Sequence, residues 1–139
     1  VKVSEEELEF LTGIDDVVAG SRRMFSDYNL KMLLVTLGDR GCYFRTAGLE
    51  DHVPGFAVST VDTTGAGDAF LGGMLYGILS HRKRLQEWDR EDVTAAVRFA
   101  NAVGALSTTK NGAIPAMPSL EEIHRFLACA SGFDEAKVR

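Results

Sequence analysis

The 139-residue sequence lacks the features of disulfide-stapled, membrane-spanning and nucleic-acid-binding proteins. Its two cysteines, Cys42 and Cys129, stand far apart and outside any CxxC motif. We therefore predict free thiols in a reducing, cytoplasmic compartment rather than a disulfide or a metal site. No apolar run reaches about 18 residues, which argues against a transmembrane helix. The net charge of −5, without a lysine and arginine cluster, argues against nucleic acid and membrane surfaces as partners.

The two commonest phosphate-binding loops are also missing. No GxxxxGK[ST] sequence occurs, so there is no Walker A loop. The dinucleotide fingerprint GxGxxG fails as well, because Phe70 occupies the third glycine position after Gly65 and Gly67. The three histidines have no metal-ligand spacing. A phosphate site in this chain must therefore be of another kind.

What is present is the composition of an ordinary globular domain, with 45% hydrophobic and 25% charged residues. The length suits about one domain. The sequence starts without a methionine, directly in Val1-Lys2-Val3, which is typical of the end of a strand. We therefore interpret the chain as a piece of a longer protein whose first strands need neighbours from outside it.

The first half of the chain predicts two helices followed by strands. Ser4 and Glu7 fit a capping box at the start of a helix that Gly13 closes. A continuous apolar run at residues 32–36 predicts a strand that is buried on both faces. The other elements expected here are a helix over residues 15–28, a turn over 37–41, a return strand over 42–45 and an extended stretch over 53–61.

The second half predicts three helices. The first begins near residue 66, and its glycines Gly72, Gly73 and Gly77 suggest close packing against a neighbour. The others cover residues 91–109 and 119–130, with a second capping box at the start of the last and a frayed tail over 131–139. This order indicates an α/β fold with a parallel sheet, helices on its faces and ligand sites at the carboxyl ends of its strands.

Residues 62–70, DTTGAGDAF, carry more special residues than a turn needs. In the first turn of the following helix, Gly65, Ala66 and Gly67 leave the unpaired backbone N–H groups open to an anion. Asp68 lies in the same turn and could accept a proton from an attacking hydroxyl, while Asp62 could hold a cation or orient the loop. A plain helix cap explains the same residues, so the motif alone leaves both readings open.

The motif closely resembles the C-terminal signature of the PfkB, or ribokinase-like, carbohydrate kinase family. Three further segments resemble the family in the same order: residues 4–13, 35–44 and 100–119. Together the four segments cover nearly the whole chain. Their residues most resemble those of fructokinase-like members. The resemblance implies the C-terminal portion of a three-layer α/β/α fold with a mainly parallel sheet, so that residues 1–139 form the nucleotide-binding part of one kinase domain.

The resemblance also implies roles for individual residues. Asp68 would be the catalytic base, and the backbone of Gly65, Ala66 and Gly67 would form the anion hole for the γ-phosphate of ATP. The expected nucleotide site comprises Thr36, Leu37, Gly38, Asp39, Arg40, Gly41, Asn101 and Ser4.

Metal sites follow from the same resemblance. Glu7 matches the glutamate of the family's N-x-x-E motif and would organise Mg²⁺ through water. Ser4 replaces the motif's asparagine, which weakens that assignment and keeps the capping box as an alternative. A monovalent cation such as K⁺ would lie among Asp62, Thr64, Ser107, Lys110, Gly112 and Ala116.

The implied function is phosphorylation of a sugar hydroxyl, most readily that of fructose, by ATP. Family members are roughly twice as long, so the N-terminal half with most sugar contacts and the lid would be missing, and the fragment alone would be inactive. We also expect it to expose an apolar sheet edge or face and to associate. A homodimer of the full-length protein is a further expectation. The alternatives are a non-catalytic nucleotide-binding module and a kinase of a nucleoside or another small alcohol.

Overall fold

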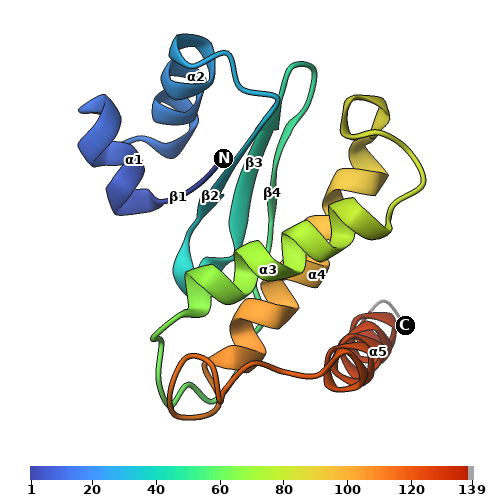
Figure 1. Cartoon of the computed structure of the whole chain (residues 1–139). Coiled ribbons are helices and arrows are strands. Elements are labelled where there is room, and N and C mark those ends of the chain that lie inside the picture. The colour runs from blue at the N-terminus through green and yellow to red at the C-terminus, as the bar shows by residue number, and fades with distance from the viewer. Residues whose placement is uncertain (138–139) are drawn as a thin grey trace.

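The computed structural model describes residues 1–137, which form a four-stranded sheet with helices on both faces (Figure 1). The strands follow the chain in the order β1-β2-β3-β4 across the sheet. Their bounds are β1 (Lys2–Ser4), β2 (Met32–Thr36), β3 (Cys42–Thr46) and β4 (Glu50–Val53). The helices are α1 (Glu5–Thr12), α2 (Val17–Asp27), α3 (Ala66–Ser80), α4 (Arg90–Ser107) and α5 (Leu120–Lys137), with short 3₁₀ turns η1 (Gly38–Arg40) and η2 (Leu85–Glu87).

The sheet of this chain is mixed, whereas we expected a mainly parallel sheet for the fold. Among the strands of the described residues, only β1 and β2 pair in parallel, with Val3 opposite Val35. The pairs β2–β3 and β3–β4 are antiparallel. The reason lies in the connections: short turns join β2 to β3 and β3 to β4, and a tight turn can only join antiparallel neighbours. A crossover through α1 and α2 brings β2 back beside β1.

The sheet is the middle layer of three. In β2, Leu33 and Val35 pack in a buried cluster with residues of α1 and α2. The alternate residues, Met32 and Leu34, pack in a second cluster with residues of α3 and α4. Figure 1 shows these two helix pairs on opposite sides of the strands. The predicted strand with two buried faces is therefore confirmed.

Helices α3 and α4 approach each other closely at one of the three expected glycines. A Cβ on Gly73 would lie 2.9 Å from Val103 Cγ2, so a side chain there would push the helices apart. Gly77 leaves room for ordinary contact, at 3.5 Å from Ala96 Cβ. The expectation fails for Gly72, which faces open space. In α4, the apolar residues Val93, Ala96, Val97 and Ala100 are buried against α3 and the sheet.

Two predicted boundaries are wrong. The fourth strand ends at Val53, where we expected an extended stretch to begin, and residues 54–60 form an irregular loop. The loop ends are held by α4 rather than by a strand, since Asn101 binds the carbonyls of Val53 and Pro54 and the Val61 N–H binds Thr108 O. The signature therefore follows a loop and not a strand. The last helix continues to Lys137 instead of ending near Ala130, and residues 138–139 of the expected frayed tail lie outside the described residues.

In the part of the chain that the structure describes, no helix has the length and apolar character needed to cross a membrane. Both cysteines are free thiols, as predicted. Burial raises the pKa of the Cys42 thiol to about 12, because its charged form would lose hydration inside the core. Cys42 is thus an inert core residue.

Candidate active site

The start of α3 has the backbone geometry of an anion-binding turn. Gly65 caps the helix in the left-handed conformation, at φ 77° and ψ 5°, which glycine adopts without strain. The Ala66 N–H donates to Thr63 O at 3.1 Å, and the Ala69 N–H donates to Gly65 O at 2.8 Å. The N–H groups of the intervening first turn have no acceptor within the helix. They carry the positive end of the helix dipole.

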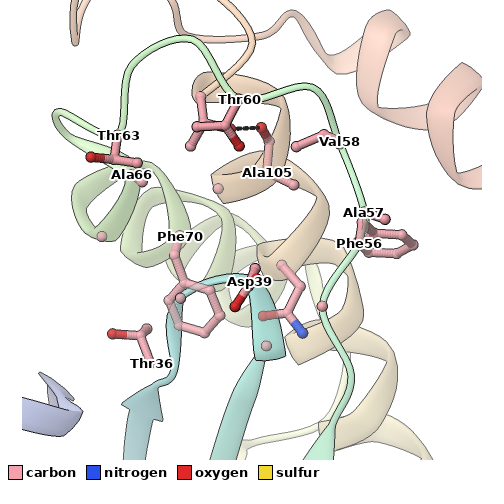
Figure 2. A pocket seen from close by; sticks show the side chains of 17 residues that line it. Thr36, Asp39, Phe56, Ala57, Val58, Thr60, Thr63, Ala66, Phe70 and Ala105 are labelled. Atoms are coloured by element: carbon pink, nitrogen blue, oxygen red, sulfur yellow. Dashed lines mark hydrogen bonds between the residues drawn. The ribbon is translucent and has the colours of Figure 1, made fainter.

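This turn forms one end of a pocket of about 580 Å³ (Figure 2). Its walls come from four places: the end of β2 with η1, the loop over residues 54–61, the first turns of α3, and α4. In Figure 2, Thr63 and Ala66 lie on one side of the pocket, and Thr36 and Asp39 on another. The lining residues are Thr36, Gly38, Asp39, Gly41, Gly55, Phe56, Ala57, Val58, Thr60, Thr63, Ala66, Gly67, Phe70, Asn101, Gly104, Ala105 and Thr108.

Most of the predicted nucleotide residues meet at this pocket. Thr36, Gly38, Asp39, Gly41 and Asn101 line it together with Ala66 and Gly67. Two residues of the same turn do not. Leu37 packs with the cluster under α1 and α2, and the Arg40 guanidinium forms an ion pair with Glu5.

The turn over residues 38–41 and the segment that follows β4 cross with their backbones in contact. A Cβ on Gly41 would collide with Val53 O, and a Cβ on Gly55 would collide with Asp39 O. Gly41 also has φ 98°, in the left-handed region. Gly41 and Gly55 thus allow the two backbone segments that form this wall of the pocket to lie in direct contact.

Asn101 fastens the same wall to α4. It is 7% exposed, and its Nδ2 donates to Val53 O at 3.1 Å and to Pro54 O at 3.0 Å. Both amide hydrogens are thereby committed to the backbone, so Oδ1 is the atom left to accept a bond from a ligand. Asn101 holds the pocket wall in place.

Asp62 joins the two loops that flank the start of α3. Its Oδ1 accepts from the Thr64 N–H at 2.9 Å, and its Oδ2 accepts from the Gly112 N–H at 3.0 Å. Hydrogen bonds from Thr64 and Gly112 lower the pKa of Asp62, and those from Thr64 have the larger effect. The Asp62 N–H in turn donates to Thr108 O at 3.0 Å. Both carboxylate oxygens are therefore used inside the protein.

The other predicted cation residues have side chains that are buried or bonded within the protein. The Lys110 ammonium pairs with Glu122 at the start of α5, at 3.1 Å. The Ser107 hydroxyl donates to Gly104 O at 2.7 Å, and Ala116 is buried. No group of three or more His, Cys, Asp or Glu side chains in the described residues is arranged to hold a metal ion. Asp62, Thr64 and Gly112 do meet, through the hydrogen bonds of the Asp62 carboxylate.

Ser4 and Glu7 form the capping box that the sequence suggested. The Ser4 N–H donates to Glu7 Oε2 at 2.7 Å, and the Glu7 N–H donates to Ser4 Oγ at 3.1 Å. This reciprocal pair starts α1 directly after β1, beside the carboxyl end of β2, where Ser4 is in register with Thr36. The cap holds the Glu7 carboxylate at the start of α1.

Sequence reasoning missed the wall formed by the loop after β4. We predicted an extended stretch over residues 53–61, whereas residues 54–60 form a loop. Phe56 packs edge-on against Phe126 at 5.0 Å, and the Arg98 guanidinium lies 5.0 Å from its ring centre. The Phe56 ring points away from the pocket in Figure 2, which leaves the loop backbone facing inward. Gly55 was the available signal, because a glycine inside an apparent strand often marks a close backbone approach.

The first 120 residues match the family model described as pfkB family carbohydrate kinase. The chain belongs to this family. It is 49% identical over 123 residues to fructokinase-1 of Zea mays, covering 88% of this chain and 38% of that protein. The pfkB chain thus spans about two fifths of the length of the curated relatives it matches.

Solved structures show the same fold. A fructokinase from Vibrio cholerae O395, described with fructose, ADP and a calcium ion, aligns with a TM-score of 0.82 and 40% identity, over 91% of this chain and 40% of that one. A double mutant of that enzyme is described with fructose, ADP and a potassium ion. An aminoimidazole riboside kinase from Salmonella enterica, complexed with its riboside and an ATP analogue, aligns with a TM-score of 0.78 and 36% identity, over 91% of this chain and 41% of that one. The ribokinase-like fold of the pfkB chain is therefore established.

Proposed function

We propose that the full-length protein is an ATP-dependent sugar kinase and that this chain supplies its nucleotide and phosphate side. The observation that carries the proposal is the start of α3, where Ala66 and Gly67 line the pocket and the exposed carboxylate of Asp68 follows in the same turn. Membership of the pfkB family and the nucleotides named with its solved relatives support it.

In this mechanism the nucleotide lies in the pocket with its γ-phosphate toward the start of α3. The free backbone N–H group of Gly67 stabilises the negative charge of the transferring phosphoryl group, while the Ala66 N–H donates to Thr63 O and shapes the turn. Asp68 is exposed and makes no ion pair among the described residues, so its carboxylate is available to take the proton of the attacking hydroxyl. The bond from the γ-phosphorus to the β-phosphate oxygen breaks as the new bond to the sugar oxygen forms, and ADP leaves.

Metal ions are part of the proposal. The described residues offer no carboxylate cage, which suits Mg²⁺ held mainly by phosphates and water, with Glu7 contributing through water. When bound, Mg²⁺ would neutralise phosphate charge. A K⁺ ion beside the Asp62 loop would depend on backbone carbonyls, since both Asp62 oxygens already accept N–H bonds.

Fructose is the acceptor that the relatives favour, because the most similar curated proteins include several named fructokinases. The similarity to an aminoimidazole riboside kinase keeps a riboside as the second candidate. We also propose that the rest of the longer protein supplies most sugar contacts, so that the chain alone does not turn over. Two free thiols suit the cytoplasm as the location.

The test is ADP release by the full-length protein with a panel of fructose, other sugars and ribosides. We expect Asp68→Asn to lower kcat by about 10²- to 10⁴-fold with little change in the KM for ATP, because only proton transfer is lost. Asp15→Asn, at an exposed aspartate between α1 and α2, is the matched control and should behave as the wild type. Normal turnover by Asp68→Asn would refute the assigned base. Nucleotide binding without turnover of any acceptor by the wild type would favour the non-catalytic module.

A further inference from the structure

Lys2 lies beside Gly67, a residue that lines the pocket, although it is far from the signature in sequence. A Cβ built on Gly67 would be 3.1 Å from the Lys2 Nζ, so the ammonium rests directly against the first turn of α3. The alternation of β1 explains this placement. Val3 packs in the cluster under α1 and α2, so Lys2 points to the opposite face, where its register partner Leu34 packs against α3.

No carboxylate of the described residues pairs with the charge of Lys2. Lys83 and Lys110 form ion pairs with carboxylates, but Lys2 forms none among the described residues. Its side chain is only partly exposed, unlike that of Lys31, which is exposed at the other end of β2. An unpaired ammonium beside the positive end of a helix is unfavourable by itself. An anion bound between the two would satisfy both.

We propose that the Lys2 ammonium binds the phosphoryl group during its transfer, opposite the backbone N–H group of Gly67. Resting on the proposed kinase function, this assignment adds a residue to the site. In the step itself, the Lys2 ammonium donates a hydrogen bond to a non-bridging oxygen of the γ-phosphoryl group and keeps its proton. The hydroxyl proton passes to Asp68, and the electron pair of the broken P–O bond leaves with ADP. Lys2 therefore stabilises charge and takes no part in proton transfer.

The Lys2 ammonium also lies next to the space that a side chain on residue 67 would enter. A methyl group there would meet the ammonium at a distance tighter than ordinary contact, and the lysine end would shift by a few tenths of an ångström. Gly67 therefore gives the anion access to the backbone and leaves room for the lysine.

The experiment compares Lys2→Met, Lys2→Arg and the control Lys31→Met in the full-length protein. Binding of tripolyphosphate, measured by calorimetry, should weaken at least about tenfold in Lys2→Met and much less in Lys2→Arg, because the latter keeps the charge. In turnover, Lys2→Met should lower kcat/KM for ATP by about 100-fold, as loss of a single donor to a transition-state oxyanion does, and leave the KM for the sugar unchanged. Lys31→Met should match the wild type in both measurements.

Failure of this inference is distinct from failure of the proposed function. Wild-type turnover with no effect of Lys2→Met on turnover or tripolyphosphate binding would overturn the role of Lys2 and leave the kinase in place. A wild type without turnover would overturn the kinase, and tripolyphosphate binding would still decide the role of Lys2. Thermal unfolding checks that the variants fold. Should Lys2→Met not fold, Lys2→Arg and the neutral Lys2→Gln make the same comparison.

Discussion

At the scale of single residues, Gly65 meets two separate demands. Its φ of 77° lies in the left-handed region, and a Cβ there would come within 2.8 Å of Ala113 Cβ in the loop after α4. The first demand is local and was visible in the sequence as a glycine before a helix. The second arises from a segment distant in sequence, because Ala113 occupies the space that a Cβ on residue 65 would need.

We predict that Gly65→Ala lowers the free energy of unfolding by about 1–2 kcal/mol from the backbone alone, with the contact to Ala113 adding to it. Gly48→Ala is the control, because a Cβ at Gly48 meets nothing within 4 Å and its φ is not in the left-handed region. Urea unfolding of the two variants measures the difference. Equal stability of the two would show that the left-handed turn is not maintained in solution.

At the scale of elements, the start of α5 is held by one carboxylate. Glu122 accepts from the Ser119 N–H at 2.7 Å in a capping box and from the Lys110 ammonium at 3.1 Å. These hydrogen bonds lower the pKa of Glu122 to about 2, and the bond from the Ser119 N–H has the largest effect. Glu122 thereby ties α5 to the loop that also carries Gly112, beside the candidate site.

This cap predicts a dependence of stability on pH. Because the pKa of Glu122 falls from 4.5 to about 2 on folding, its stabilisation is complete above pH 4.5 and disappears as the pH drops toward 2. The difference in unfolding free energy between the wild type and Glu122→Gln should therefore be constant near neutral pH and shrink in that acidic window. Glu121→Gln, which loses only an exposed pair with Arg125, is the control. A difference that does not change with pH would contradict the cap.

At the scale of the whole molecule, one face of α3 is apolar and uncovered. The side chains of Leu75 and Leu79 are 50% and 84% exposed, and Leu71 and Tyr76 lie beside them. We expected an uncovered sheet edge or face, and the described residues place much of the exposed apolar surface on this helix. Since the chain spans about two fifths of its relatives, we propose that the rest of the longer protein covers this face.

The 139-residue chain should accordingly self-associate, because exposed apolar surface is removed from water on contact. Leu79→Glu, at the most exposed leucine of the face, should shift sedimentation toward the monomer without changing the circular dichroism spectrum. Leu11→Glu, at an exposed leucine of α1, is the control and should leave the association unchanged. Monomeric wild type at high concentration would refute this use of the α3 face.

The sequence by itself determined the features that depend on neighbouring residues. The capping boxes at Ser4 and Ser119, the doubly buried strand over residues 32–36 and the glycine-rich helix start follow from local chemistry, and all of them are present. Resemblance to a family then gave the fold and the candidate roles. These predictions needed no knowledge of what lies across the molecule.

Only the tertiary structure decided the contacts between distant segments. It made residues 54–60 a pocket wall because Asn101 fastens the segment that follows β4, and it brought Gly41 against the carbonyl of Val53. It also placed Lys2 against Gly67, a pair that nothing in the spacing of the sequence connects. The physical reason is that a local pattern specifies which face of an element is buried, whereas packing of the elements specifies which residues meet there.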